Sequence, residues 1–191
     1  IRAASPDKDY AQFQKGLCLG LQQKWTEKIT VLKALLADKP GSQYAADAKF
    51  QLGETYLNLE NDAEALRYYK QVLDGHPNSP HTRQSMLQTA LIHKRGGEAD
   101  KALDEFKAIV TKYPTLDESR DALAGVKSIY VEQGRVAEYE TYLSTLSFVD
   151  PGSQDLDNDY YLSAEKFYMD KNCEKAVGAF KDYLNKYPNG G

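Results

Sequence analysis

The three histidines are the residues of this sequence with the most versatile chemistry, because an imidazole can bind a metal ion or transfer a proton near neutral pH. His76 and His81 flank the loop HPNSPH, and a helix break is expected between them. No cysteine or carboxylate cluster completes a ligand set around them. We therefore expect both to be solvated turn residues. The sequence repeats with a period of 37 residues, as described below. The positions equivalent to His93 in the other repeats hold Leu, Tyr or Phe, and we expect His93 to pack within its own repeat.

The cysteines, Cys18 and Cys173, are the second group with potential chemistry. Two are too few for a disulfide framework. We expect free, buried thiols that behave as small hydrophobic side chains, with redox chemistry as the alternative. The repeats described below place the two cysteines in the first and fifth modules, beyond the reach of a disulfide.

Two loops have a superficial likeness to ligand-binding motifs. Gly96 and Gly97 are followed by Glu98 instead of the lysine and hydroxyl pair of a phosphate-binding loop. The segment DPGSQDLDND lacks the central glycine and the terminal glutamate spacing of a calcium loop, so we interpret it as a loop rich in helix caps. The sequence therefore predicts no catalytic residues, no metal site and no cofactor, and we expect a protein that is not an enzyme.

The bulk composition excludes two further classes of function. The net charge is −4, and basic residues are scattered among acidic ones, which does not fit a nucleic-acid binder. No window approaches the roughly 18 to 20 apolar residues that span a bilayer. The sequence shows no secretory signal. It opens with Ile1 instead of methionine, and for this reason we interpret it as a trimmed piece of a longer protein.

The elements that position these residues are set by an internal repeat. Five of the seven prolines recur with a period of 37 residues: Pro40, Pro77, Pro114, Pro151 and Pro188. Periods of about 20 to 50 residues are typical of solenoids. Aligned on the prolines, the sequence shows columns at offsets of three, four and seven, which predict one face of a helix. These columns are Lys28, Ala65, Ala102, Tyr139 and Ala176; Leu32, Tyr69, Phe106, Leu143 and Phe180; and Leu35, Val72, Ile109, Leu146 and Tyr183.

A first helix precedes that second helix in each module. Its columns are Phe13, Phe50, Leu87, Ala124 and Tyr161; Gly16, Gly53, Ala90, Lys127 and Ala164; and Leu19, Tyr56, His93, Tyr130 and Phe167. In most modules a small residue lies between two large ones. The short polar turns between the helices suit an antiparallel pair.

Proline and serine delimit the modules. Proline fixes φ and lacks an amide donor, so it ends the second helix. Ser42, Ser79 and Ser153 follow, where a side-chain oxygen can accept from the free amides of the next helix. Both chain ends fall in an inter-module loop, and we infer an excerpt from a longer array. The last helix carries apolar residues such as Val177 and Leu184 with nothing after it to cover them.

At these columns the sequence resembles the tetratricopeptide repeat (TPR) family. The best module reads AADAKFQLGETYLNLENDAEALRYYKQVLDGHP, with Gly53, Tyr56, Ala65, Tyr69 and Pro77 at the signature positions. The resemblance implies an all-α fold, a right-handed α-solenoid of about five helix-turn-helix modules and ten antiparallel helices. We expect a single domain over residues 1–191, with modules at about 5–41, 42–78, 79–115, 116–152 and 153–191.

The period of 37, three longer than the usual TPR, resembles bacterial cell-envelope TPR proteins, including outer-membrane assembly lipoproteins and large Bacteroidetes arrays. The resemblance implies a periplasmic or envelope-associated full-length protein. The fourth module departs from the family, because Lys127 and Tyr139 stand where small residues let the helices approach. We expect the helix pair of residues 120 to 150 to be splayed or rotated; the alternative is that Tyr139 points outward.

In TPR proteins the first helices line a concave groove that holds a partner peptide, and the resemblance carries this role over by position. The implied groove residues are Phe13, Leu17, Phe50, Glu54, Asn58, Leu87, Leu91, Lys94, Arg95, Ser128, Glu132, Tyr161, Glu165 and Tyr168. Aromatic residues interleaved with both signs of charge suit a polypeptide ligand. The competing interpretation is that the apolar members pack between modules. Phe13 and Leu17 stand where a co-chaperone TPR domain has its carboxylate-clamping lysine and asparagine, so binding of chaperone tails is not expected.

Three hypotheses for function remain at this point. The first is a non-catalytic protein-interaction scaffold that binds another protein or peptide segment. The second is a structural self-assembly module that docks through its exposed last repeat. The third is a substrate-positioning region of a larger envelope enzyme. The expected partner is a polypeptide, with no nucleic acid and no membrane-spanning segment.

Overall fold

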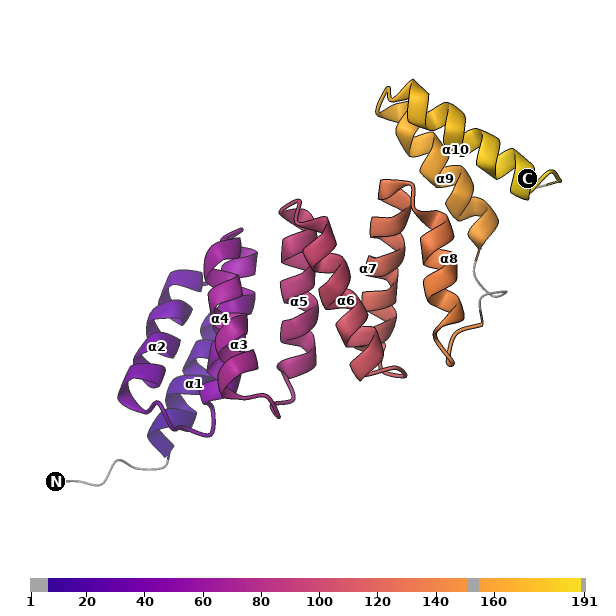
Figure 1. Cartoon of the computed structure of the whole chain (residues 1–191). Coiled ribbons are helices and arrows are strands. Elements are labelled where there is room, and N and C mark those ends of the chain that lie inside the picture. Colours follow the sequence, from indigo (N-terminus) through magenta and orange to yellow (C-terminus); the bar gives the residue numbers. More distant parts are fainter. Residues whose placement is uncertain (1–6, 151–154, 190–191) are drawn as a thin grey trace. The chain divides into compact units, whose positions relative to one another are not determined.

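The computed structural model describes residues 7–150 and 155–189, and all regular secondary structure within those ranges is helical (Figure 1). The helices there are α1 (Asp7–Leu21), α2 (Trp25–Asp38), α3 (Ala45–Asn58), α4 (Asp62–Gly75), α5 (Thr82–Arg95), α6 (Ala99–Lys112), α7 (Asp117–Gln133), α8 (Val136–Ser144), α9 (Leu156–Met169) and α10 (Cys173–Lys186). The predicted all-α fold of ten paired helices is confirmed.

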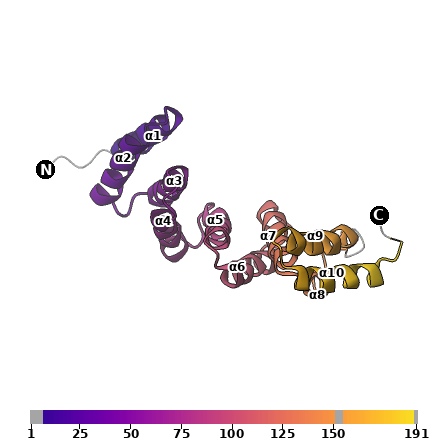
Figure 2. The same ribbon diagram turned by 90° about the horizontal axis from the view of Figure 1, so that it is seen from above.

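The chain divides into two compact units, residues 1–92 and 93–191, with α5 running across the boundary. In the first unit α1 packs against α2 and α3 against α4, and α2 also contacts α3 (Figures 1 and 2). In the second unit α7 packs against α6, α8 and α9, and α9 packs closely against α10. The organisation of the whole chain as one domain with the expected module bounds stays a prediction.

The turn inside each helix pair has the same backbone geometry in all five pairs. One residue per turn has positive φ, at intervals of 37 residues: Gln23 (57°), Glu60 (55°), Gly97 (83°), Gly134 (74°) and Lys171 (60°). The next amide then donates to the carbonyl five residues earlier, as Asn61 N does to Tyr56 O at 2.8 Å. This bond ends the first helix with a left-handed cap. Only two of the five positions carry glycine, the residue that adopts this conformation at least cost.

The prolines act as the sequence predicts. Four of the five periodic prolines lie in the described ranges, and each comes two residues after the last residue of a second helix: Pro40, Pro77, Pro114 and Pro188. The residue between is held out of the helical region, as at His76 with φ −141° and ψ 55°, because proline disfavours helical geometry in the residue before it. Pro151 lies outside the described residues.

The serines after the prolines act one residue earlier than predicted. Ser42 Oγ accepts from Tyr44 N at 3.2 Å, and Ser79 Oγ accepts from His81 N at 3.2 Å. Helices α3 and α5 begin at the following residues, so each serine fixes the amide just before its helix instead of one within it. Ser153 lies outside the described residues.

Glycine lets the helices of the first two pairs approach closely. A Cβ on Gly16 would lie 2.5 Å from Leu32 Cδ2, and a Cβ on Gly53 would lie 2.6 Å from Tyr69 Cε1. Leu32 and Tyr69 are fully buried in the core of the first unit. The predicted role of the small column is therefore confirmed in these pairs.

The fourth helix pair, α7 and α8, packs differently from the first two pairs. Tyr139 is buried, with 1% of its surface exposed, so the alternative that it points outward is wrong. Burial raises the pKa of its hydroxyl to about 12. The small residue of α7 is Gly125, two positions before Lys127, and its Cβ would lie 2.7 Å from Phe106 of α6. Helix α7 packs along much more of α6 than of α8, and α8 has only nine residues. This helix pair therefore departs from the others in that its first helix, α7, packs mainly against α6 of the preceding pair instead of its own second helix, α8.

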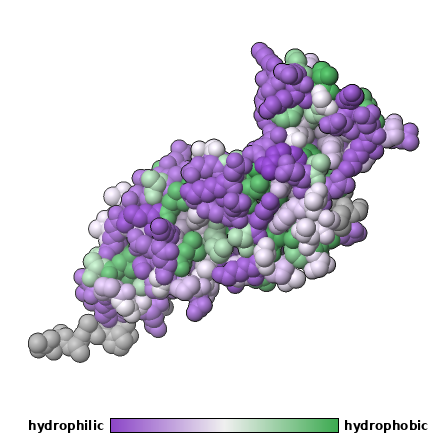
Figure 3. Space-filling model, in the orientation of Figure 1, coloured by the Kyte–Doolittle hydropathy of each residue, from purple (hydrophilic) through white to green (hydrophobic). Residues whose placement is uncertain are grey.

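Two further expectations concern the surface. Cys18 and Cys173 are free, but both are exposed, so the prediction of buried thiols is wrong. Each cysteine lies on the side of its helix that faces away from the apolar core. Neither position belongs to the repeat columns that predicted the core. The visible face is largely hydrophilic, with hydrophobic side chains in smaller patches, some of them over α9 and α10 (Figure 3). None of the described helices has the length and hydropathy that crossing a bilayer requires.

Candidate protein-binding surface

The first-helix residues predicted to line a groove differ in exposure by column. Phe13, Phe50 and Leu87 belong to one column and are 9%, 9% and 3% exposed. Their side chains fill the fold itself and leave little surface for a partner, as the packing interpretation has it. Leu91, one turn further along α5, is 37% exposed. The binding role of the whole set stays a prediction.

The buried aromatic residues are covered by rings from the start of the next first helix. Tyr44 stacks on Phe13 with ring centroids 5.4 Å apart and planes 11° apart. His81 stacks on Phe50 at 4.3 Å and 9°. The imidazole is also fixed by Asp47, whose Oδ1 lies 2.6 Å from Nε2. An aromatic ring and a carboxylate thus hold a flat side chain between modules.

A buried polar network lies behind the half-buried Glu54. Lys28, which is 5% exposed, donates from Nζ to Gln51 Oε1 at 2.8 Å. Burial lowers the pKa of Lys28, and the charge of Glu54 opposes this shift. Glu54 accepts a short hydrogen bond from the Tyr69 hydroxyl, and burial followed by this bond raises the pKa of Tyr69. Glu54 is therefore occupied by intramolecular contacts on one side.

In the second unit three predicted residues come together. Lys94 Nζ donates to Ser128 Oγ at 2.6 Å and lies 3.0 Å from Glu132 Oε1, while Ser128 Oγ donates to Glu132 Oε1 at 2.7 Å. Partial burial raises the pKa of Glu132, but the hydrogen bonds from Ser128 and Lys94 outweigh it and keep that pKa below its ordinary value. Arg95 is exposed at the end of α5. The cluster places both signs of charge at the surface of the second unit.

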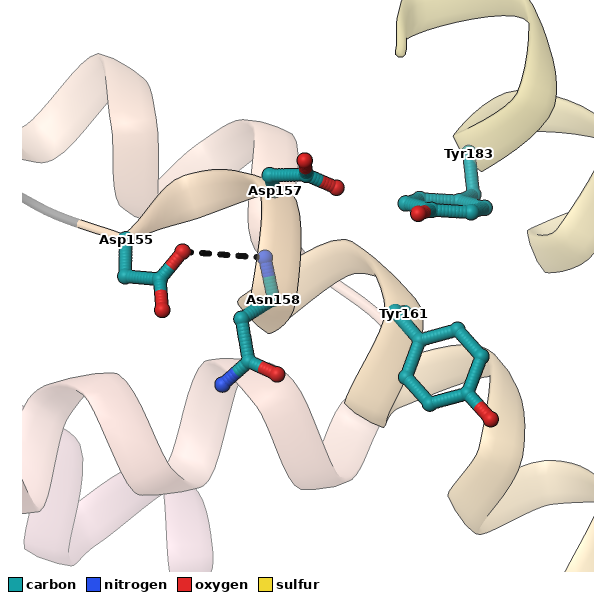
Figure 4. A pocket seen from close by; sticks show the side chains of 5 residues that line it. All are labelled: Asp155, Asp157, Asn158, Tyr161 and Tyr183. Atoms are coloured by element: carbon teal, nitrogen blue, oxygen red, sulfur yellow. Dashed lines mark hydrogen bonds between the residues drawn. The ribbon is translucent and has the colours of Figure 1, made fainter. Parts of the chain in front are cut away.

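The predicted residues of α9 include two exposed tyrosines beside a pocket. Tyr161 and Tyr168 are 40% and 61% exposed, and the Tyr161 hydroxyl donates to Glu165 Oε1 at 3.3 Å. A pocket of about 460 Å³ opens beside Tyr161 (Figure 4). Its lining consists of Asp155, Asp157, Asn158, Tyr161 and Tyr183. Sequence reasoning missed the pocket because it depends on how α10 sits against the start of α9.

The histidines are more engaged than the sequence indicates. His76 Nε2 lies 3.0 Å from Lys49 Nζ, and burial together with that charge lowers the pKa of His76. Since His81 is held by Asp47 and Phe50, the expectation of solvated turn residues is wrong for both; each reaches back onto α3. His93 is buried as expected, with Nδ1 2.7 Å from Glu105 Oε2 on α6. No group of three metal-ligating side chains occurs among the described residues.

One charged pair was not foreseen from the sequence. Asp159 of α9 is fully buried, and Lys127 Nζ approaches its Oδ1 at 2.7 Å. Among the described residues neither Asp159 oxygen has a further hydrogen-bond partner. Burial raises the pKa of Asp159, and Lys127 opposes the shift. Lys127 is thus directed to the next helix pair, which explains its presence in a column of small residues.

The fold places the chain among TPR-like helical repeat proteins. A tetratricopeptide repeat protein from Parabacteroides merdae is 18% identical, with a TM-score of 0.65 over 95% of this chain and 67% of that one. MamA is 15% identical, with a TM-score of 0.62 over 95% and 93%. YrrB, a TPR protein with an unusual peptide-binding site, is 15% identical, with a TM-score of 0.60 over 97% and 89%. At these identities the likeness shows the fold.

The family is shown by a match over residues 1–128: the chain belongs to the family of the N-terminal domain of the T7SS, ESX-1 secretion system protein EccA1. This family differs from the outer-membrane lipoproteins and Bacteroidetes arrays that the period of 37 residues resembles. No curated protein matches the chain in a direct sequence comparison.

Proposed function

We propose that this chain is a non-catalytic scaffold that binds a partner polypeptide through the surface of its first helices. One observation carries the proposal. The last-turn column of the first helices is exposed in all five repeats, and its members are Leu21, Asn58, Arg95, Glu132 and Met169. A column that the core leaves exposed in every repeat offers side chains of mixed chemistry, which suits an extended or helical polypeptide.

A capture experiment tests the proposal. The chain is immobilised and exposed to lysate of its source organism, beside the variants Leu91→Asp and Leu116→Asp. The two leucines are 37% and 39% exposed, and both changes add one negative charge. Leu91 lies on the first helix α5, one turn before Arg95, whereas Leu116 lies outside the first helices, just before α7. We expect Leu91→Asp to lose the partner and Leu116→Asp to keep it. Equal retention by both variants contradicts binding at this surface.

We propose that the full-length protein acts at the cell envelope as part of a secretion apparatus. The description of its family, a secretion-system protein, supports this assignment. The partner would then be another component of the apparatus or a polypeptide that it exports. A fluorescent fusion of the full-length protein that spreads evenly through the cell, with no enrichment at the envelope, argues against it. A periplasmic location and a substrate-positioning role beside an enzyme remain predictions.

Self-assembly through α10 is the second candidate function. Val177 and Leu184 are 69% and 62% exposed, whereas Leu103 and Val110, at the same positions of α6, are 5% and 0% exposed under α7. An apolar face covered in one repeat and open in another is suited to a second chain. Light scattering at several protein concentrations tests this role. A mass that rises with concentration in the wild-type chain but stays that of a monomer in Val177→Glu supports self-assembly. A wild-type chain that is monomeric at every concentration contradicts it.

A further inference from the structure

A second pocket, of about 350 Å³, lies beside the start of α7 in the fourth repeat. Its apolar lining comes from Pro114 before α7, from Leu123 within α7, and from Phe148 and Val149 after α8. Leu123 and Val149 are half-buried, and Phe148 is 40% exposed. A mostly apolar hollow with a few polar groups is typical of a binding site.

The early end of α8 places Phe148 and Val149 in this pocket. Helices α4 and α6 end at Gly75 and Lys112, which stand at the repeat position of Val149, whereas α8 already ends at Ser144. The two apolar residues thus follow the helix instead of completing its last turn. The same two positions in the other repeats hold Ala37 and Asp38; Asp74 and Gly75; Thr111 and Lys112; and Asn185 and Lys186. Two large apolar residues at this place are therefore a property of the fourth repeat.

A buried hydroxyl without a partner also lines the pocket. Ser119 is 2% exposed, and within the part of the chain that the structure describes its Oγ has no hydrogen-bond partner. Leaving a buried polar group unpaired is unfavourable, so a ligand that supplies the missing partner gains affinity.

The preceding repeat shows which partner this hydroxyl position takes. Thr82 stands 37 residues before Ser119 and is 5% exposed. Its Oγ1 donates to the backbone carbonyls of His76 and Pro77, both at 3.1 Å. These two residues belong to the non-helical segment between α4 and α5. The position therefore accommodates backbone carbonyls of a segment that is not helical.

In the fourth repeat the chain does not supply these carbonyls. Helix α5 begins at Thr82, whereas α7 begins at Asp117, two residues before Ser119. The segment before α7 therefore follows a different path, and neither equivalent carbonyl accepts from Ser119.

The charged residues of the pocket favour an uncharged occupant. Arg120 and Asp150 are both among the lining residues and have opposite signs. Arg120 is also paired with Asp117 at the surface. Since neither sign dominates, a charged side chain gains little here.

We propose that this pocket binds an extended segment of a partner polypeptide, with one apolar side chain against Phe148 and Leu123 and a backbone carbonyl that accepts from Ser119. The proposal rests on the proposed scaffold function, since the partner delivers the segment. It adds a contact at the N-terminal half of the first helix α7.

The test titrates the chain with N-acetyl-leucine N-methylamide, which carries one apolar side chain between two peptide groups, and follows backbone amide resonances by NMR. We expect saturable shifts at Ser119, Leu123 and Phe148, with an affinity in the millimolar range. N-acetyl-serine N-methylamide keeps the peptide groups without the apolar side chain and should bind at least fivefold more weakly. Phe148→Ala should weaken binding of the leucine probe to a similar extent. Leu162→Ala, which removes a similarly exposed apolar side chain from α9, should have no effect.

A second arm separates binding by the hydroxyl from a role in folding. Because Ser119 Oγ has no partner in the free chain, Ser119→Ala should leave the urea midpoint unchanged or raise it, while the leucine probe binds at least threefold more weakly. Thr82→Ala is the matched control. It removes a hydroxyl that has two acceptors at the same repeat position, so its urea midpoint should fall.

Four results overturn the proposal: no saturable shift at the pocket, equal binding of the two probes, equal binding of the leucine probe to Ser119→Ala, or a urea midpoint that falls in Ser119→Ala as it does in Thr82→Ala. The last outcome would mean that the chain itself satisfies the hydroxyl. Because the probe requires no partner, its failure leaves the scaffold function standing. A loss of partner capture in the lysate experiment likewise leaves a positive probe result intact.

Discussion

Gly53 offers the sharpest test of how the helix pairs are held together. In Gly53→Ala the new methyl carbon would lie 2.6 Å from Cε1 and 2.9 Å from Cδ1 of Tyr69. Carbon atoms pack best at about 3.5 to 4.0 Å, so α3 and α4 must separate by about 1 Å or the ring must move. The ring cannot move easily, because Tyr69 is fully buried and its hydroxyl is bonded to Glu54.

The magnitude follows from two opposing effects. Overpacking of a core costs about 1 to 3 kcal/mol. Alanine is the better helix former by about 1 kcal/mol, which offsets part of that cost. The net cost is then about 0 to 2 kcal/mol, and we expect Gly53→Ala to lower the free energy of unfolding by about 1 kcal/mol. Gly178→Ala is the matched control, because Gly178 is also inside a helix but has nothing within 4 Å of its Cβ position. It should raise the free energy of unfolding by about 1 kcal/mol.

The assay is urea unfolding followed by circular dichroism, with hydrogen exchange to read each helix pair separately, since repeat arrays do not always unfold in one step. A Tyr69→Leu background removes the clash, and there Gly53→Ala should cease to destabilise. If Gly53→Ala stabilises the chain as much as Gly178→Ala does, the close approach of α3 and α4 has no energetic role and the reasoning is refuted.

Three further predictions follow from backbone geometry and charge. Gly97→Ala should lower the free energy of unfolding by about 1 kcal/mol, because Gly97 has φ +83° but an open Cβ position; an unchanged urea midpoint would show that the turn relaxes without cost. The lowered pKa of His76 means that the folded chain binds its proton less readily than the unfolded chain, so stability should fall as the pH drops through 6.5 and below. In Lys49→Met an NMR titration should show a higher pKa for His76, and an unchanged value would contradict the role of Lys49. Lys127→Met should cost about 3 kcal/mol at neutral pH because Asp159 is left buried without its cation, and the loss should shrink in acid as the carboxyl is protonated; a loss independent of pH would mean that packing, not charge, is the cause.

The fold could be predicted from the sequence because its signals are local and repeated. Proline ends each second helix through its own ring and its effect on the preceding residue, and the same is true wherever it occurs. The close pairing at Gly53 was likewise readable, since a glycine between two large residues has few other reasons to recur. By contrast, the positive φ of Glu60 and Lys171 could not be predicted from the sequence, because neither glutamate nor lysine is typical of a left-handed turn.

The candidate site could be predicted only in part, because a column position does not fix exposure. Phe50 is covered by His81, which lies in the next repeat, and no local pattern announces that stacking. Lys127 was noticed as an unsuitable residue for a helix contact, but its partner Asp159 is 32 residues away and belongs to a different helix pair. The pocket at Tyr161 needs residues from both α9 and α10. These features depend on long-range packing.

Photo-crosslinking tests the central claim, binding along the first helices, most directly. A photoreactive phenylalanine analogue is placed at Asn58 on α3 and, as the control, at Lys70, which is also exposed, on the second helix α4 of the same pair. The full-length protein carrying each is irradiated in its source organism. We expect a discrete crosslinked partner from position 58 and none from position 70. Crosslinking from position 70 alone, or the same product from both positions, would contradict a binding surface on the first helices.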